Sequence, residues 1–159
     1  MSRWDAEAIR LGMAEEVLME SAARCAMDSL RQHWAAKGRS LAKASVLLLA
    51  GSGNNGGDAY CMARHLLDAG ACPVLVCTRT PEQCRGAAAH WYNVAIALGV
   101  PVFSAEDWEK DAPGIPSRPD IVIDGLLGTG FHGELREREA RLVDKLNALA
   151  APFVLAVDI

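Results

Sequence analysis

The chain has 159 residues, of which 51% are hydrophobic and 23% are charged, so it is predicted to be one globular domain and not a disordered segment. Its 16 basic residues against 20 acidic ones give a net charge of −4, which argues against nucleic acid as a partner. Charges interleaved in the first residues argue against a secretory leader, and no apolar run reaches the ~18 residues that cross a membrane. The five cysteines lack a CxxC pair and mostly fall in predicted buried elements, which predicts reduced core thiols in a cytosolic protein.

Hydrophobic periodicity predicts the elements in chain order. Apolar residues at steps of three or four predict a long amphipathic helix from Ala14 to about Gly38. The period changes over Ser45–Ala50, and the short apolar run Val46–Leu49 predicts a parallel strand that is covered on both faces. Further helices are predicted over 58–69, 81–98 and 136–149, and further strands over 73–77, 100–103, 121–123 and 153–157.

This alternation of strands and helices predicts the α/β class, as a Rossmann-like three-layer αβα sandwich with a mainly parallel sheet and right-handed crossovers. The stretch 104–119 contains three prolines and is expected to be a surface loop. In the last predicted helix, Glu134/Arg138 and Glu137/Arg141 are spaced for ion pairs.

The first candidate site is the glycine-rich segment 51–58, directly after the first strand. Its glycines would let the backbone approach a ligand closely and adopt positive φ. The helix that follows would offer its free N-terminal amides to an anion, and Asp58 would cap that helix. Gly51, Gly53 and Gly56 match GxGxxG, but Thr78 and Arg79 stand where a dinucleotide fold places its ribose-binding acid. Arg79 could meet a 2′-phosphate if a cofactor lay in that conventional pose, but the missing acid argues against the pose. The segment therefore predicts a binding loop without identifying its ligand.

Two further strand ends carry acids. Asp124 opens a second glycine-rich loop that runs to Glu134 and includes His132, and Asp158 follows the last strand. In parallel sheets ligands bind beyond the carboxyl ends of the strands, so these residues are expected at one crevice with the first loop. Asp124 could accept a ribose hydroxyl, bind a cation or simply form a turn.

Five segments carry a family resemblance: Asp5-Ala-Glu-Ala-Ile, Leu18-Met-Glu-Ser, Gly53-Asn-Asn-Gly-Gly-Asp58, Asp124-Gly-Leu-Leu-Gly-Thr-Gly130 and Ala156-Val-Asp-Ile159. With them the chain resembles the NAD(P)H-hydrate epimerases, or YjeF N-terminal domains. The resemblance implies that residues 1–159 are a single domain of this type without its C-terminal strands. It also implies an isomerase that interconverts the R and S forms of hydrated NADH and NADPH in nicotinamide-nucleotide repair.

The resemblance assigns the site residue by residue. Asp158 would be catalytic, and we hypothesise that its carboxyl protonates the departing C6 hydroxyl before water adds to the opposite face. Asn55 and Asp124 would bind a potassium ion. The substrate would be bound by Asn54, Asn55, Gly56, Gly57, Asp58, Gly128, Thr129, Gly130, Phe131, His132, Gly133, Glu134 and Asp158.

The chain departs from the family pattern at Ala59, where glycine is common, and at Ser21, where asparagine is common. The family continues after Ile159, so the chain is expected to be a weakly active or inactive fragment. The resemblance further implies a homodimer and, in a longer protein, fusion to a dehydratase that uses ADP or ATP. Two alternatives stay open: a noncatalytic binding or scaffold module of the same type, and an NAD(P)-dependent oxidoreductase.

Overall fold

The sheet has five strands, all parallel. The computed structural model of the protein describes residues 3–128, 130–131, 133–149 and 151–158. The strands occur in the order β3-β2-β1-β4-β5, and the β1–β4 junction is where the strand order reverses. Their bounds are β1 Ser45–Ala50, β2 Cys72–Cys77, β3 Val102–Ser104, β4 Ile121–Gly125 and β5 Val154–Ala156.

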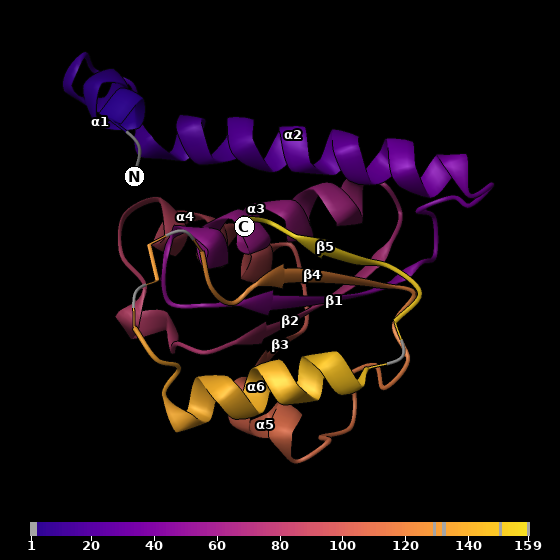
Figure 1. Ribbon diagram of the computed structural model, residues 1–159. Coiled ribbons are helices and arrows are strands. Elements are labelled where there is room, and N and C mark those ends of the chain that lie inside the picture. The colour runs from indigo at the N-terminus through magenta and orange to yellow at the C-terminus, as the bar shows by residue number, and fades with distance from the viewer. Residues whose placement is uncertain (1–2, 129, 132, 150, 159) are drawn as a thin grey trace.

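Helices cover both faces of this sheet, which confirms the predicted α/β class and its three layers. Figure 1 shows α3 and α4 against one face with α2 lying across them, and α5 and α6 against the opposite face. The bounds are α1 Arg3–Arg10, α2 Glu15–Ala36, α3 Asn54–Asp68, α4 Gly86–Ala97, α5 Ala105–Glu109 and α6 Glu137–Ala148, with a 3₁₀ turn η1 at Pro81–Gln83.

The position of β1 at the centre of the sheet explains why its sequence is apolar from Val46 to Ala50. Val46 and Leu48 pack into the core under α2, α3 and α4, whereas Leu47 and Leu49 pack into the core under α5 and α6. All four side chains are fully buried. Successive side chains of a strand point to opposite faces, so a strand with helices on both faces needs apolar residues throughout.

The predicted helix over 81–98 is in fact two elements. After η1, Cys84 and Arg85 have extended backbone angles, and α4 begins at Gly86, whose φ is +55°. The apolar periodicity of 81–98 did not reveal this break because the separating residues are few. As a result the η1 segment and Arg85 lie at the carboxyl end of the sheet, not along a helix.

The stretch 104–119 is also more ordered than its prolines suggest. Ser104 caps α5, its Oγ accepting a hydrogen bond of 3.0 Å from the amide of Asp107, and Trp108 is buried against the sheet. The prediction of a bare surface loop was wrong there. Glu137 and Arg141 form the predicted ion pair at 2.9 Å, but Glu134 precedes α6 and so is not on the helix with Arg138.

Three of the five cysteines are buried, which fits the predicted core thiols. Cys61, Cys77 and Cys84 are buried, Cys25 and Cys72 are exposed, and all five are free. Within the described ranges, no helix has both the length and the apolar character required to cross a membrane.

Candidate functional site

The first glycine-rich segment is mostly helix. Only residues 51–53 separate β1 from α3, which begins at Asn54 with Gly53 as its N-cap. The predicted start at residue 58 was too late, and Asp58 lies inside the helix and does not cap it. No side chain caps α3, so its first amides are directed toward the carboxyl edge of the sheet, where an anion could accept their hydrogen bonds.

The glycines in the two loops allow the loops to touch each other. A Cβ on Gly51 would lie 1.9 Å from the carbonyl oxygen of Leu126, and one on Gly56 would lie 2.1 Å from the Gly51 carbonyl oxygen. A Cβ on Gly128 would lie 2.4 Å from Nδ2 of Asn55. Gly51 and Gly56 do not have the positive φ that was predicted. Their lack of a side chain serves close backbone packing, which fixes one loop against the other.

This packing brings Asn55 and Asp124 into one region. The Nδ2 of Asn55 donates to the carbonyl oxygen of Leu127 at 2.7 Å, so its amide oxygen points elsewhere as an acceptor. Asp124 Oδ1 accepts from the amide of Leu126 at 3.1 Å. The Asp124 carbonyl oxygen accepts from the Val157 amide at 2.9 Å, which holds the end of β5 beside the second loop.

A cleft of about 510 Å³ opens at this edge, called here the main cleft. Of the predicted site residues, it is lined by Asn54, Asn55, Gly128, Gly130, Phe131 and Asp158. Residues after β1, β4 and β5 therefore meet at one crevice, because these strands are neighbours and run parallel. Asp124 supports the wall of the cleft without lining it.

The other predicted site residues lie elsewhere or outside the description. Gly56 and Gly57 are buried in α3, where a Cβ on Gly57 would lie 2.5 Å from the Met19 methyl group. Gly133 and Glu134 are exposed and do not line the main cleft. Thr129 and His132 lie outside the described residues.

Asp58 lines a smaller adjoining cavity of about 180 Å³, the Asp58 cavity, beneath α1 and α2. Burial, and to a smaller extent the charge of Asp158, raises the pKa of Asp58 to about 7. Asn54 and Asp5 line both this cavity and the main cleft. Two carboxyl groups thus interact across the cleft wall, and one of them changes its charge near neutral pH.

Sequence reasoning gave no role in the site to Asp5 or to α1. Two signals were available, the segment at Asp5 that contributed to the family resemblance and the amphipathic pattern of residues 3–10, but the helix is short and polar and has no buried residue. Only the tertiary structure shows that α1 closes one side of the cleft.

The two departures from the family pattern are accommodated. Ala59 lies within α3 and is fully buried, so alanine is compatible with the helical backbone there. Ser21 Oγ donates to the Val17 carbonyl oxygen at 2.9 Å, within α2.

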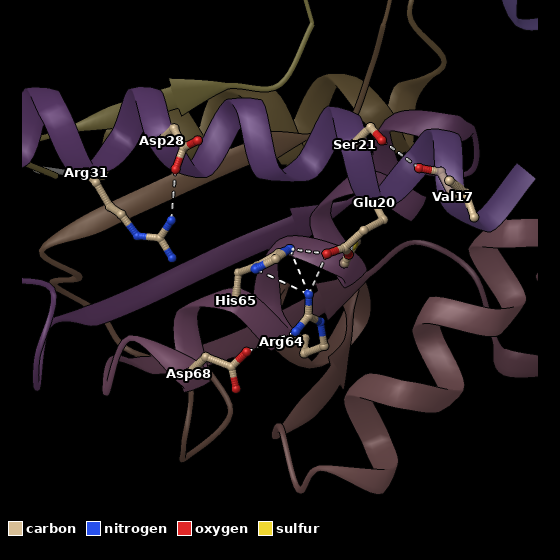
Figure 2. Close-up of polar contacts among 9 residues, drawn as sticks. Val17, Glu20, Ser21, Asp28, Arg31, Arg64, His65 and Asp68 are labelled. Atoms are coloured by element: carbon tan, nitrogen blue, oxygen red, sulfur yellow. Dashed lines mark hydrogen bonds and ion pairs between the residues drawn. The ribbon is translucent and has the colours of Figure 1, made fainter.

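Behind the site, a polar cluster joins α2 to α3 (Figure 2). Glu20 Oε1 lies 2.7 Å from Arg64 Nη2 and 3.1 Å from His65 Nε2, and the Cys61 thiol donates to Glu20 Oε2 at 2.9 Å. Burial by itself raises the pKa of Glu20, but hydrogen bonds from Cys61 and Arg64 and the charge of His65 outweigh it and the pKa is lowered. Burial and the Arg64 charge lower the pKa of His65. The cluster therefore acts as an ion pair that fixes α2 over α3.

Glu20, Cys61 and His65 also place three possible metal-ligand atoms within 4.8 Å of one another. The Arg64 guanidinium already occupies the position beside Glu20 that a cation would take. Burial, followed by the hydrogen bond to Glu20, raises the pKa of the Cys61 thiol, which opposes the thiolate that a metal requires. We interpret the cluster as structural.

The chain matches the family described as "YjeF-related protein N-terminus" over residues 15–159. It is 38% identical over 143 residues to the NAD(P)H-hydrate epimerase of Rhodopirellula baltica, covering 90% of this chain and 54% of that protein. The NAD(P)H-hydrate epimerase of Nitrosopumilus maritimus is 30% identical, and the match covers 94% of this chain and 66% of that protein. The bifunctional NAD(P)H-hydrate repair enzyme of Thermanaerovibrio acidaminovorans is 34% identical, and the match covers 97% of this chain and 29% of that protein.

The chain thus spans less than two thirds of the length of these relatives. The crystal structure of a yeast protein matches the fold with a TM-score of 0.73 and 24% identity, covering 98% of this chain and 65% of the yeast chain. The family match covers most of the chain and includes both glycine-rich loops and the end of β5. The chain therefore belongs to the family of YjeF-related protein N-terminal domains.

Proposed function

We propose that this chain is an epimerase that interconverts the R and S forms of hydrated NADH and NADPH. The observation that carries the proposal is the main cleft, where Asp158 lies with Asn54 and Asn55 and interacts with Asp58, whose pKa is about 7. Family membership and the names of the curated relatives support it. A carboxyl group that is partly protonated at neutral pH suits acid and base catalysis.

The two carboxyl groups suggest how the reaction proceeds. Near pH 7 the Asp58 carboxyl is about half protonated, because burial and, to a smaller extent, the charge of Asp158 raise its pKa to about 7. In this proposal Asp58 supplies the proton that Asp158 passes on. Asp158 gives a proton to the C6 hydroxyl, which leaves as water while the ring nitrogen lone pair forms an iminium ion. A water molecule then adds to the opposite face of the ring and releases its extra proton to solvent, and Asp158 regains a proton from its surroundings, so no net proton is consumed. Such assistance is worth about 10²- to 10⁴-fold in rate.

We further propose that Asn55 and Asp124 hold a potassium ion. In the described structure, the Asn55 amide oxygen and the second carboxylate oxygen of Asp124 are not used in hydrogen bonds, and backbone carbonyls of the second loop are adjacent. Amide, carboxylate and carbonyl oxygens fit a hard monovalent cation. When bound, the ion would supply positive charge to an anionic substrate. Its binding can be measured by comparing the melting temperature in potassium and sodium chloride.

The test is epimerisation of hydrated NADPH, followed by proton NMR. The Asp158→Asn variant should bind NADP⁺ normally and epimerise about 10²- to 10⁴-fold more slowly. Asp144→Asn, which removes an exposed carboxylate on α6, is the matched control and should retain the wild-type rate. An unchanged rate in Asp158→Asn would refute the catalytic assignment.

The same experiment separates the alternatives. A noncatalytic module would bind NADP⁺ without epimerising hydrated NADPH, and an oxidoreductase would instead transfer hydride. A dehydratase that uses ADP or ATP would consume one of the two epimers. We also propose a cytoplasmic homodimer, to be tested by analytical ultracentrifugation. The free cysteines support a reducing compartment, and exposed apolar side chains near the N-terminus support an interface: Trp4, Leu11, Met13 and Val17.

A further inference from the structure

A second cavity of about 590 Å³ lies beyond the ends of β1, β2 and β4, between the η1 segment and the start of α6. We call it the arginine cavity, because its lining includes Arg79, Arg85, Arg136 and Arg138. We infer that it binds the 2′-phosphate of the substrate, so that the protein prefers hydrated NADPH to hydrated NADH. This inference rests on the proposed function, which leaves that preference open.

The arginine cavity is positively charged, whereas the whole chain is negatively charged. The net charge of the protein is −4, yet four guanidinium groups line the arginine cavity with a single carboxylate, Glu139. Arg79 Nη1 donates to the Gln83 carbonyl oxygen at 3.2 Å, and Arg85 Nη1 to the Cys84 carbonyl oxygen at 2.7 Å. Neutral carbonyls thus orient these arginines without cancelling their charge.

Among the described residues the arginines have no close ion-pair partner, although acidic side chains lie in the same region: Glu139 lines the arginine cavity, and Lys110 and, more weakly, Arg138 lower the pKa of Glu106. None of the four arginines forms an ion pair with another residue in the part of the chain that the structure describes. Guanidinium groups that share one cavity repel each other, and an anion bound among them relieves this repulsion. Phosphate is the anion that several arginines recognise best, because each guanidinium can donate two parallel hydrogen bonds to it.

The arginine cavity adjoins the main cleft. Ser52, Leu126 and Leu127 line both of them, so one extended ligand can occupy both. With the nicotinamide ring at Asp158, the rest of the dinucleotide extends past the uncapped N-terminus of α3 toward the arginines. The tertiary structure therefore allows Arg79 to meet a 2′-phosphate without the conventional pose.

The arginines fit the 2′-phosphate better than the diphosphate. The α3 amides beside the main cleft are neutral donors, which suit the diphosphate that both dinucleotides share. A phosphate monoester carries about −1.5 to −2 charges at neutral pH, and clustered guanidinium groups match this higher charge. Only NADP and its hydrates carry this group, so the arginine cavity discriminates between the two dinucleotides.

The test measures dissociation constants for NADP⁺ and NAD⁺ by isothermal titration calorimetry. Wild-type protein should bind NADP⁺ more tightly than NAD⁺. Arg79→Gln and Arg138→Gln, which act from opposite walls, should each weaken NADP⁺ binding about 10-fold and leave NAD⁺ binding nearly unchanged. Arg24→Gln is the matched control, because it removes an exposed arginine of α2 that lines neither cavity. Circular dichroism verifies that each variant is folded.

Two outcomes would overturn the inference: equal wild-type affinity for the two dinucleotides, or equal losses for both in the arginine variants, which would assign the arginines to the diphosphate. The failure of the proposed function is separately visible. Selective NADP⁺ binding without epimerisation of hydrated NADPH would reject the epimerase and keep the arginine cavity as a 2′-phosphate site. Epimerisation without any preference for NADP⁺ over NAD⁺ would keep the epimerase and reject the arginine cavity as a 2′-phosphate site.

Discussion

Asp58→Asn should make the protein more stable at neutral pH than the wild type. The wild-type Asp58 pKa rises from 3.8 to about 7 on folding, chiefly through burial and secondarily through the Asp158 charge. A pKa raised in the folded state means that stability is greatest while the carboxyl is protonated in both states. That stability is lost as pH rises from about 4 through about 7, because the unfolded chain ionises first.

The magnitude follows from the pKa change. One pKa unit corresponds to about 1.4 kcal/mol, so the wild-type free energy of unfolding should fall by about 4 kcal/mol across this pH range from Asp58 alone. Asparagine has nearly the same shape and cannot ionise, so Asp58→Asn removes this fall. The Asp58 cavity also holds Asp5, Glu15 and Arg85, which are present in both proteins. Their contributions largely cancel in the comparison.

Urea unfolding followed by far-ultraviolet circular dichroism, at about pH 4.5, 6 and 8, measures the difference. The two proteins should be similar in stability at the lowest pH, and the variant should gain progressively as pH rises. Asp144→Asn is the control and should follow the wild-type profile, since that carboxyl is exposed. A difference between wild type and Asp58→Asn that stays constant with pH would refute the reasoning.

Two further substitutions test the packing around the site and in the core by thermal unfolding. Gly51→Ala should destabilise the protein by at least about 3 kcal/mol, because its Cβ would lie 1.9 Å from the Leu126 carbonyl oxygen. Gly53→Ala is the control and should have a mild effect, because its Cβ would meet nothing within 4 Å. Equal losses of stability in the two variants would contradict the loop packing. Trp34→Ala should cost about 3 to 5 kcal/mol because the side chain is 2% exposed. Trp4→Ala, 81% exposed, should cost little, and a similar loss in both would contradict the assigned core.

Much of the fold could be predicted from the sequence because its causes are local. The run Val46–Leu49 of β1 is too short for a buried helix and has no polar residue, which predicts a strand with both faces covered. The acids after β4 and β5 could be placed at one edge because parallel neighbouring strands end on the same side. The break at Cys84 and the helix α5 were missed, since each depends on a few residues whose periodicity is weak.

The sequence by itself determined the order of strands and helices, the glycine-rich loops and the family, because each depends on residues that are close together in the chain. Only the tertiary structure shows that the carbonyl oxygen of Leu126 leaves no room for a side chain at Gly51. It also shows that burial, beside Asp158, raises the pKa of Asp58 to about 7. It alone gathered Arg79 and Arg138 around one cavity. The physical reason is that steric contact, desolvation and charge clustering depend on distances between residues far apart in the chain.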